Sequence, residues 1–397
     1  MTSIHDVVTV FRKWLYLPSL IPLYAALGTA AGNRLQGEPV WLMLVGAPSS
    51  GKTELLMSLK ELPEVRVVGT LSEGGLLSGT SQKERALSAQ GGLLKEIGDF
   101  GQLIVKDFTS VLSMAKTGQG PLLAALREIY DGHWTRTVGT DGGQSLAWSG
   151  KLGLLAACTD VIDSHYGVVS SMGERFVFCR MPTLEDAQAC WTALEHRDQR
   201  TAMRADLSGT VGELFSGLED DQTADELDQY DKTRLAGLAR LAAKARSHVQ
   251  RDSRSRAIVY VPESEAPPRL ILVLAQLLRG MRTLDIPAQD RWSVLRHIAV
   301  SSMPSARRRV FDCLTNHSQA LTQGEVETAS RLPGSTAQRA LEDLHVHGLI
   351  TTEDGGSGRH RRWSLVPWVA DLLEGESPKS IEGAAGSLSS TPTYFSG

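Results

Sequence analysis

Eight consecutive residues match the pattern G-x-x-x-x-G-K-[ST] and read Gly46-Ala47-Pro48-Ser49-Ser50-Gly51-Lys52-Thr53. Glycines let a backbone curl so that successive N–H groups face phosphate oxygens, and a helix that begins there adds the positive end of its dipole. In this pattern Lys52 reaches the β- and γ-phosphates of a triphosphate, and the Thr53 hydroxyl ligates Mg²⁺. The turn, with the adjoining Glu54, therefore predicts a binding site for ATP and Mg²⁺.

A second chemical feature is an apolar run that ends in a carboxylate, Leu103-Ile104-Val105-Lys106-Asp107. Ligands of open parallel sheets bind at the carboxyl ends of the strands. An aspartate that ends a neighbouring strand is therefore expected beside the phosphate-binding turn. This makes Thr53 and Asp107 the two predicted metal ligands.

Both features need a buried parallel sheet to position them. Short, almost wholly apolar runs bounded by turn residues are typical of strands that are buried on both faces. Such runs occur at residues 40–45, 65–68, 103–105, 152–158 and 176–179. Helices are expected between them, for example at 53–62 and 121–130. This alternation predicts an α/β fold, with a parallel sheet that carries helices on both faces.

From residue 38 to about residue 300 the chain resembles the P-loop ATPases of the AAA+ class. Within that class it is similar to the group of minichromosome maintenance helicases, magnesium chelatases and MoxR-type ATPases. Four further segments carry the resemblance: residues 122–128 with 135–138 and a hairpin turn at 141–143, Cys158-Thr159-Asp160, Gly173-Glu174-Arg175-Phe176, and Pro268-Arg269.

The resemblance implies a role for one residue in each of the last three segments. Thr159 would contact the γ-phosphate or the attacking water, Arg175 would act as an arginine finger toward a neighbouring subunit, and Arg269 would be the sensor-2 arginine of a lid helix. A ring of identical subunits, such as a hexamer, follows from the same resemblance. Ordinary roles stay open: Thr159 fits a strand cap, Arg175 an ion pair, and Arg269 a surface position at a helix start.

The sequence departs from that family at one place. Phe108 follows Asp107 where the family carries a glutamate that polarises water. Phenylalanine cannot accept a proton or orient water, so either another carboxylate does this work or hydrolysis is slow. The candidate carboxylates are Glu73, Asp99 and Glu128.

The last part of the chain resembles a winged helix. Helices are expected at 310–314, at 322–331 with Thr322 as N-cap, and at 335–347, followed by β-like stretches at 350–352 and 361–366. Glutamine and arginine on an exposed third helix can read base edges, and arginines on a wing suit phosphates. DNA contacts are therefore predicted for Thr336, Gln338, Arg339, Arg359, Arg361 and Arg362. The alternative is a protein-docking winged helix, because acidic residues dilute the charge.

These features divide the 397 residues into five parts. They are a helical N-terminal segment (1–37), the AAA+ P-loop core (38–182), an all-α lid with an acidic insertion (183–300), the winged helix (301–374) and a disordered tail (375–397). Lys and Arg number 41 and Asp and Glu number 45, which gives a net charge of −4. A wholesale basic polyanion binder is excluded, whereas a local basic surface is not.

Two further observations concern the compartment. Residues 14–33 are uncharged and about long enough to span a bilayer, but prolines, glycines and an asparagine favour a helix packed on the core. No stable membrane association is expected. The four cysteines show no CxxC spacing, which favours a reducing, cytoplasmic location.

Three functional hypotheses follow from the sequence. The first is an AAA+ ATPase that acts on DNA, as a helicase or remodeller of a mobile element or replication system. The second is an ATP-switched, winged-helix DNA-binding regulator with little hydrolysis. The third is a MoxR-like protein remodeller whose winged helix recruits a protein client.

Overall fold

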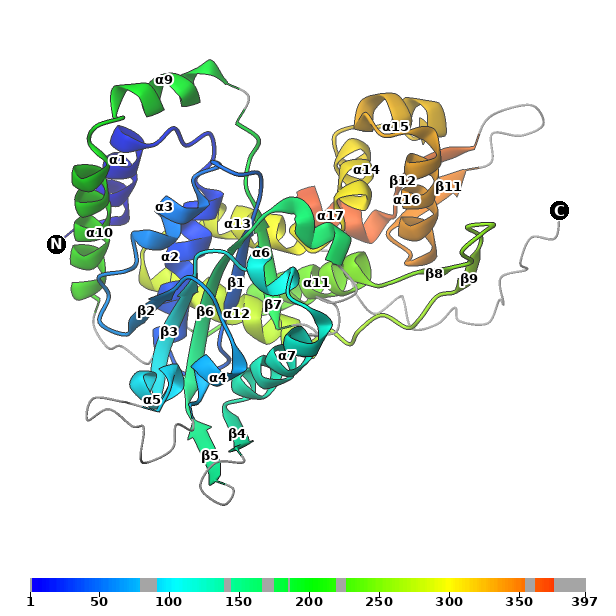
Figure 1. Cartoon of the computed structure of the whole chain (residues 1–397). Helices are drawn as coiled ribbons and strands as arrows, with labels where there is room; N and C mark the ends of the chain where they lie inside the picture. Colours follow the sequence, from blue (N-terminus) through cyan, green and yellow to red (C-terminus); the bar gives the residue numbers. More distant parts are fainter. Residues whose placement is uncertain are drawn as a thin grey trace.

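The computed structural model describes residues 2–78, 91–138, 144–165, 175–184, 186–218, 226–353 and 361–374 (Figure 1). Several expected features lie outside these ranges: the hairpin turn at 141–143, Gly173 and Glu174, residues 219–225 of the acidic insertion, Arg359, and the tail from residue 375.

Five parallel strands form the centre of the molecule. They are β1 (Trp41–Val45), β2 (Val65–Val68), β3 (Phe100–Val105), β6 (Lys151–Cys158) and β7 (Phe176–Arg180). Their spatial order is β2-β3-β6-β1-β7, and every pairing is parallel. All of β1 and nearly all of β6 is buried, as expected for strands covered on both faces. The predicted parallel α/β sheet is confirmed.

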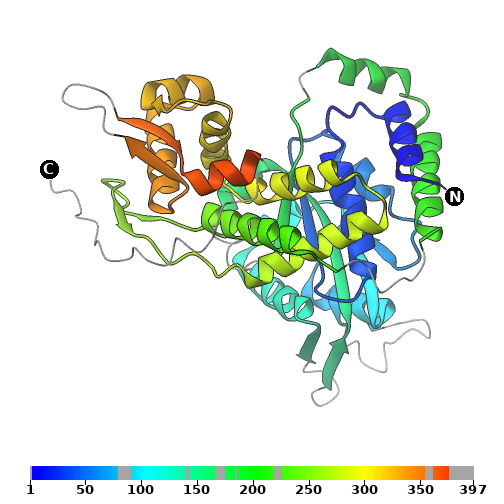
Figure 2. The same ribbon diagram turned by 180° about the vertical axis from the view of Figure 1, so that it is seen from behind.

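Helices cover both faces of this sheet. On one face lie α2 (Ile21–Arg34), α12 (Pro268–Thr283) and α13 (Ala288–Ser301), and on the other lies α7 (Lys116–Tyr130) (Figures 1 and 2). The remaining elements of this part are α3 (Lys52–Met57), α4 (Glu73–Leu76), α5 (Leu93–Ile97), α6 (Thr109–Leu112), β4 (His133–Val138), β5 (Gln144–Ser149) and η2 (Asp160–His165). Helix α3 ends at Met57, before the predicted residue 62, and the chain continues in turns.

Helix α2 is formed by the uncharged stretch near the N-terminus. Twelve of its fourteen residues are buried. Asn33 at its end pairs with the Val40 backbone: Nδ2 donates to the carbonyl at 3.1 Å, and Oδ1 accepts from the N–H at 2.7 Å. The predicted helix packed on the core is confirmed. Across the described ranges, no helix combines the length and apolar character needed to cross a bilayer.

Helices α2 and α12 touch through glycines. A Cβ on Gly280 would overlap the backbones of Gly28 and Gly32. A Cβ on Gly32 would lie 2.7 Å from the carbonyl oxygen of Gln276, whose own Nε2 donates to the Gly32 carbonyl at 2.6 Å. The missing side chains let the two backbones meet, which binds the N-terminal helix to one that comes 244 residues later.

We expect Gly280→Ala to lower the free energy of unfolding by about 1–3 kcal/mol, because a methyl group has no space between the two backbones. Gly209→Ala is the matched control, since Gly209 lies in helix α10 (Arg200–Ser216) with nothing within 4 Å of its Cβ position. The control should be neutral or stabilising by about 0.5–1 kcal/mol. Denaturant unfolding measures both, and equal stabilities would contradict the close crossing.

The helices between residues 183 and 300 form two groups, whereas the sequence predicts one all-α lid. Helix α9 (Ala187–Glu195) and α10 lie at the N-terminal end of the molecule, where α10 packs on α1 (Ile4–Trp14) (Figure 1). Helix α11 (Gln229–Arg246) packs instead on α12 and α13. A hairpin of β8 (Gln250–Arg251) and β9 (Ile258–Tyr260) interrupts this second group. Helical periodicity alone does not show which partner an apolar face has.

The C-terminal unit has the order of a winged helix. Its elements are α14 (Ser305–Thr315), β10 (Leu321–Thr322), α15 (Gln323–Ser330), α16 (Gly334–Val346), β11 (Ile350–Glu353) and β12 (Arg362–Leu365), with the three strands ordered β10-β12-β11. Thr322 caps α15 through a capping box with Glu325, as predicted. The unpredicted α17 (Pro367–Glu374) packs on α11, where Leu372 lies against Gly237.

Candidate functional site

The turn between β1 and α3 lies at the carboxyl edge of the sheet. The N–H of Gly46 donates to the carbonyl of Cys158 at 3.2 Å, which fastens the turn to the end of β6. Ser49 and Gly51 have left-handed backbones, with φ of 64° and 85°. Glycine adopts this angle without strain, and such turns form concavities that bind anions.

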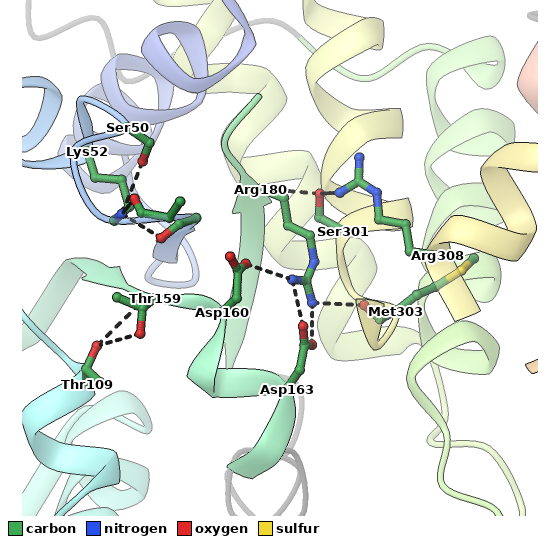
Figure 3. Close-up of polar contacts among 12 residues, drawn as sticks. Ser50, Lys52, Thr109, Thr159, Asp160, Asp163, Arg180, Ser301, Met303 and Arg308 are labelled. Atoms are coloured by element: carbon green, nitrogen blue, oxygen red, sulfur yellow. Dashed lines mark hydrogen bonds and ion pairs between the residues drawn. The ribbon is translucent and has the colours of Figure 1, made fainter. Parts of the chain in front are cut away.

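The ammonium group of Lys52 is held inside this turn (Figure 3). It donates to the carbonyls of Gly46 and Ala47, each at 2.7 Å, and to the Ser50 hydroxyl at 3.1 Å. Burial lowers the pKa of Lys52, and the nearby Asp160 carboxylate opposes that shift. The turn therefore holds a fixed cation at the place where phosphate oxygens would enter.

Asp107 and Thr159 follow β3 and β6 at the same edge of the sheet. The exposed Asp107 carboxylate accepts from the Thr109 N–H at 2.9 Å. The Thr109 hydroxyl lies 3.5 Å from the Thr159 hydroxyl and accepts from the Thr159 N–H at 3.3 Å (Figure 3). Thr109 thus joins two of the predicted site residues, although the sequence pattern assigns it no role.

A cleft of about 810 Å³ opens beside the turn. Its walls come from segments far apart in the chain: residues 45–50, Asp160, residues 180–184 at the end of β7 and just after it, Ser19 and Pro22, helix α9, and the helices α13 and α14. A volume of this size is typical of small-molecule sites. The turn forms one wall, and the cleft is large enough to hold a nucleotide.

Arg180 at the end of β7 lies between the turn and the C-terminal unit (Figure 3). Its guanidinium makes two hydrogen bonds to the Asp163 carboxylate, at 2.6 and 3.1 Å, and lies 3.7 Å from Asp160. The same group donates to the Met303 carbonyl at 3.1 Å, just before α14. Arg180 therefore connects the segment after Thr159 with the entry to the winged helix.

Arg308 of α14 shares a partner with Arg180. Its Nη1 donates to the Ser301 hydroxyl at 2.7 Å, and that oxygen also accepts from the Arg180 N–H at 3.3 Å. Burial lowers the pKa of Arg308 and raises that of the neighbouring Asp312. His297 donates from Nε2 to the Arg180 carbonyl at 2.9 Å, and burial lowers the pKa of His297 to about 4, so it is neutral at pH 7.

Arg175 and Arg269 lie near the amino-terminal ends of the parallel strands, whereas the turn lies at their carboxyl ends. Arg175 precedes the first residue of β7, whereas the turn follows the last residue of β1, which runs parallel to it. Both arginines contact Asp131, Arg175 at 2.7 Å and Arg269 at 3.9 Å, and both lie near the Tyr130 ring. The structure thus brings these two predicted residues together and separates them from the turn of their own chain.

The structure also places the predicted carboxylates. Glu54 turns toward α10: burial raises its pKa, but ion pairs with Arg204 and Arg200 outweigh this and hold the pKa below its ordinary value. Glu73 pairs with Arg136 of β4 at 3.1 Å. Asp99 precedes β3, at the edge away from the turn. Glu128 is exposed near the end of α7, close in sequence to Asp131.

On the winged helix, Gln338 and Arg361 line one hollow of about 440 Å³ between α16 and β12, together with Trp363. Thr336 lies 3.4 Å from the Arg339 guanidinium, which also donates to the Ser335 carbonyl. The Arg362 guanidinium donates to the Ala320 carbonyl at 2.7 Å. Five predicted residues lie in the part of the chain that the structure describes: Thr336, Gln338 and Arg339 on α16, Arg362 on β12, and Arg361 directly before β12.

Comparisons with known proteins concern the C-terminal unit and the overall fold. The IclR helix-turn-helix domain matches residues 309–354, so the chain carries a C-terminal winged helix of the helix-turn-helix type. A structure titled "SCCmec type IV Cch - active helicase" is similar at 10% identity and a TM-score of 0.37, over 94% of this chain and 72% of that one. The apo C-terminal region of NrS-1 is similar at 11% identity and a TM-score of 0.30, over 91% and 75%.

A comparison with curated proteins found no match. Because both TM-scores are below 0.5, the assignment of the site depends on the geometry described above.

Sequence reasoning assigned no role in the cleft to the charged residues that line it: Asp160, Arg180, Arg308, Arg309 and Asp312. Asp160 and Arg180 each end a segment that the sequence did identify, since one follows Thr159 and the other ends the last strand. Placement at the carboxyl end of a parallel strand was therefore a usable signal for both. For Arg308 no signal existed, because its position depends on the contact that brings α14 beside Ser301, which also accepts from the Arg180 N–H.

Proposed function

We propose that the chain is an ATP-binding and ATP-hydrolysing protein of the AAA+ class that acts on DNA. The observation that carries this proposal is the Lys52 ammonium held within the left-handed turn after β1, with Asp107 and Thr159 at the same sheet edge. A bound phosphate would replace the carbonyl partners of Lys52. In the described ranges no group of three His, Cys, Asp or Glu side chains could hold a metal. Mg²⁺ does not need a group of three protein ligands, because it binds through one or two side chains and the phosphates of the nucleotide.

The chain's residues would act by positioning and by charge. Mg²⁺ held by Thr53 and Asp107 would neutralise charge on the phosphate oxygens. Lys52 would bind the β- and γ-phosphates, and Thr159 would orient the water or the γ-phosphate through its hydroxyl, which Thr109 holds in place. Attack of water in line with the leaving oxygen would give ADP and phosphate.

We propose that Asp160 polarises the attacking water, the role that the family gives to a glutamate at the position of Phe108. Asp160 lines the cleft with residues 46–50, and its negative charge opposes the lowering of the Lys52 pKa by burial. Asp160→Asn is expected to lower ATP turnover by about 10²–10⁴-fold and to leave ATP affinity nearly unchanged, since general-base assistance is lost.

Glu73→Gln and Asp99→Asn are the controls, because these carboxylates pair with Arg136 or lie at the other edge. Turnover measured by phosphate release should stay within about twofold of wild type for both. Wild-type turnover by Asp160→Asn would remove Asp160 from the mechanism.

The positions of Arg175 and Arg269 at the opposite end of the strands from the turn support a homo-oligomer. Arg175 and Arg269 lie at the sheet edge away from their own turn, so they would act on the nucleotide of a neighbouring copy. Cyclic, head-to-tail assembly of identical subunits presents one edge of each subunit to the opposite edge of the next. We therefore propose a ring in which these arginines complete the adjacent site.

DNA is the proposed partner of the winged helix, on the basis of its helix-turn-helix fold and the side chains of α16 and β12. The test of the whole proposal is phosphate release by the full chain with no DNA, single-stranded DNA and duplex DNA. Stimulation by DNA supports an ATP-driven motor, and release that ignores DNA contradicts it.

An ATP-controlled DNA-binding switch is the second candidate, and a specific observation favours it. Phe108 is 2% exposed and packs against Phe176. The residue that stands in place of the usual glutamate is therefore part of the hydrophobic core. The Arg180–Ser301–Arg308 contacts connect the cleft with α14. ATP binding that changes DNA affinity without phosphate release would identify the switch.

A further inference from the structure

The β8–β9 hairpin belongs neither to the cleft nor to the helix-turn-helix domain. In the chain it follows α11 and precedes α12, and in space it lies beside α16 in both views (Figures 1 and 2). Every residue of its tip, 252–257, is exposed.

The tip has a defined shape. The Asp252 carboxylate accepts from the N–H groups of Arg254 and Ser255, at 3.0 and 2.7 Å, and from the Ser255 hydroxyl at 2.9 Å. These bonds lower the pKa of Asp252. Arg256 has a left-handed backbone with φ of 61°. The Asp252 carboxylate thus stabilises the backbone of the tip, and the exposed Arg254 and Arg256 belong to a loop of defined shape.

The base of the hairpin is fixed to the helix-turn-helix domain by a largely buried ion cluster. Arg251 donates to the Asp343 carboxylate at 2.6 Å and to the Glu342 carboxylate at 2.8 Å, both on α16. Arg307 of α14 lies 3.0 Å from the second oxygen of Asp343 and donates to the Ser247 carbonyl at 2.6 Å. The hairpin therefore keeps a fixed position relative to α14 and α16.

The tip carries positive charge in an acidic chain. Residues 250–260 contain three arginines and one aspartate, in a protein of net charge −4. Arg251 is used by the anchor, and within the described part of the chain the guanidinium groups of Arg254 and Arg256 have no hydrogen-bond or ion-pair partner. Tyr260, 58% exposed, lies at the base of the hairpin.

We propose that the β8–β9 hairpin is a second DNA-contacting element, in which Arg254 and Arg256 bind backbone phosphates beside the segment that α16 contacts. This inference rests on the proposed DNA binding by the winged helix. Phosphates fit two exposed guanidinium groups on a tip of defined backbone shape, because arginine forms charge-assisted bonds to phosphate oxygens. A hairpin rigidly held beside α16 would extend the DNA-facing surface at little cost in ordering.

The test measures affinity of the full-length protein for a labelled duplex of about 40 base pairs over a range of salt concentrations. The double variant Arg254→Ala/Arg256→Ala should weaken binding on the order of tenfold and reduce the slope of log K against log salt by about 1.8, since each lost phosphate contact removes about 0.9. Arg254→Lys/Arg256→Lys should keep the slope.

Arg12→Ala/Arg197→Ala is the charge-matched control, because both arginines are exposed on the α1–α9 side of the molecule. It changes the net charge equally and should leave the slope unchanged. Gln338→Ala/Arg361→Ala tests the winged helix itself. If only that pair weakens binding, the hairpin inference fails while the proposed function stands; if neither pair does, both fail. Tighter binding by the hairpin variant would show that the hairpin covers α16 and would overturn the inference.

Discussion

Lys52→Ala is expected to lower affinity for ATP with Mg²⁺ on the order of 100-fold or more and to reduce phosphate release to background. The ammonium is the cation fixed in the turn, with three acceptors within 3.1 Å that phosphate oxygens would replace. Two charge-assisted hydrogen bonds contribute about 3 kcal/mol or more, and each 1.4 kcal/mol is a factor of ten in affinity. Calorimetry with a slowly hydrolysed ATP analogue measures the affinity.

Lys60→Ala provides the matched control for this change. Lys60 lies after α3 and pairs with Glu61 at 3.1 Å, outside the cleft walls. Its removal should leave affinity and turnover at wild-type values. Equal ATP affinity in the Lys52 variant and the wild type would contradict every role proposed for the turn.

Arg175→Ala has the second large expected effect: turnover should fall by about 10³–10⁵-fold while ATP binding is kept. The reason is position. Arg175 lies before β7, next to Asp131 and Tyr130, at the edge away from its own turn. From this position it would assist a nucleotide held by another copy, as proposed above. Wild-type turnover should accordingly rise with protein concentration until assembly is complete, and a constant rate per chain would contradict action between subunits.

Mixing two inactive variants gives a sharper test of the same claim. A subunit with Lys52→Ala still offers its Arg175, and a subunit with Arg175→Ala still offers its Lys52. In a mixed ring about a quarter of the interfaces would combine both intact residues, because each interface draws its two sides from different copies. Partial recovery of turnover supports sharing between subunits, and no recovery after confirmed co-assembly contradicts it.

The parallel sheet could be predicted from the sequence because its strands are buried on both faces. Residues 40–45 and 152–158 are almost wholly apolar, a pattern that no surface strand needs. The turn at 46–53 could be predicted equally well from the sequence, because its glycines and its lysine are required by local backbone and phosphate chemistry. The prediction of Asp107 used the rule that ligands of parallel sheets bind at the carboxyl ends of the strands, whereas the prediction of Thr159 used the resemblance to AAA+ ATPases.

What the sequence could not predict depends on contacts between distant segments. Arg308 lines the cleft only because α14 packs beside the end of β7, and Glu54 turns away only because Arg204 of α10 reaches it. The split of residues 183–300 has the same origin, because α10 and α11 are each apolar on one side but bury that side against different partners. Periodicity reports that a face is buried and leaves its partner unspecified.

The glycine crossing of α2 and α12 sets an order of events during synthesis. Helix α2 leaves the ribosome early, but the backbone that covers Gly28 and Gly32 belongs to a segment made about 250 residues afterwards. Until then the nascent polypeptide exposes the side of α2 that α12 covers, although β1, β6 and α3 already contact other parts of the helix. Contacts so distant in sequence form slowly. We therefore expect translation products that stop before residue 268 to be captured by chaperones or to aggregate, however complete their strands are.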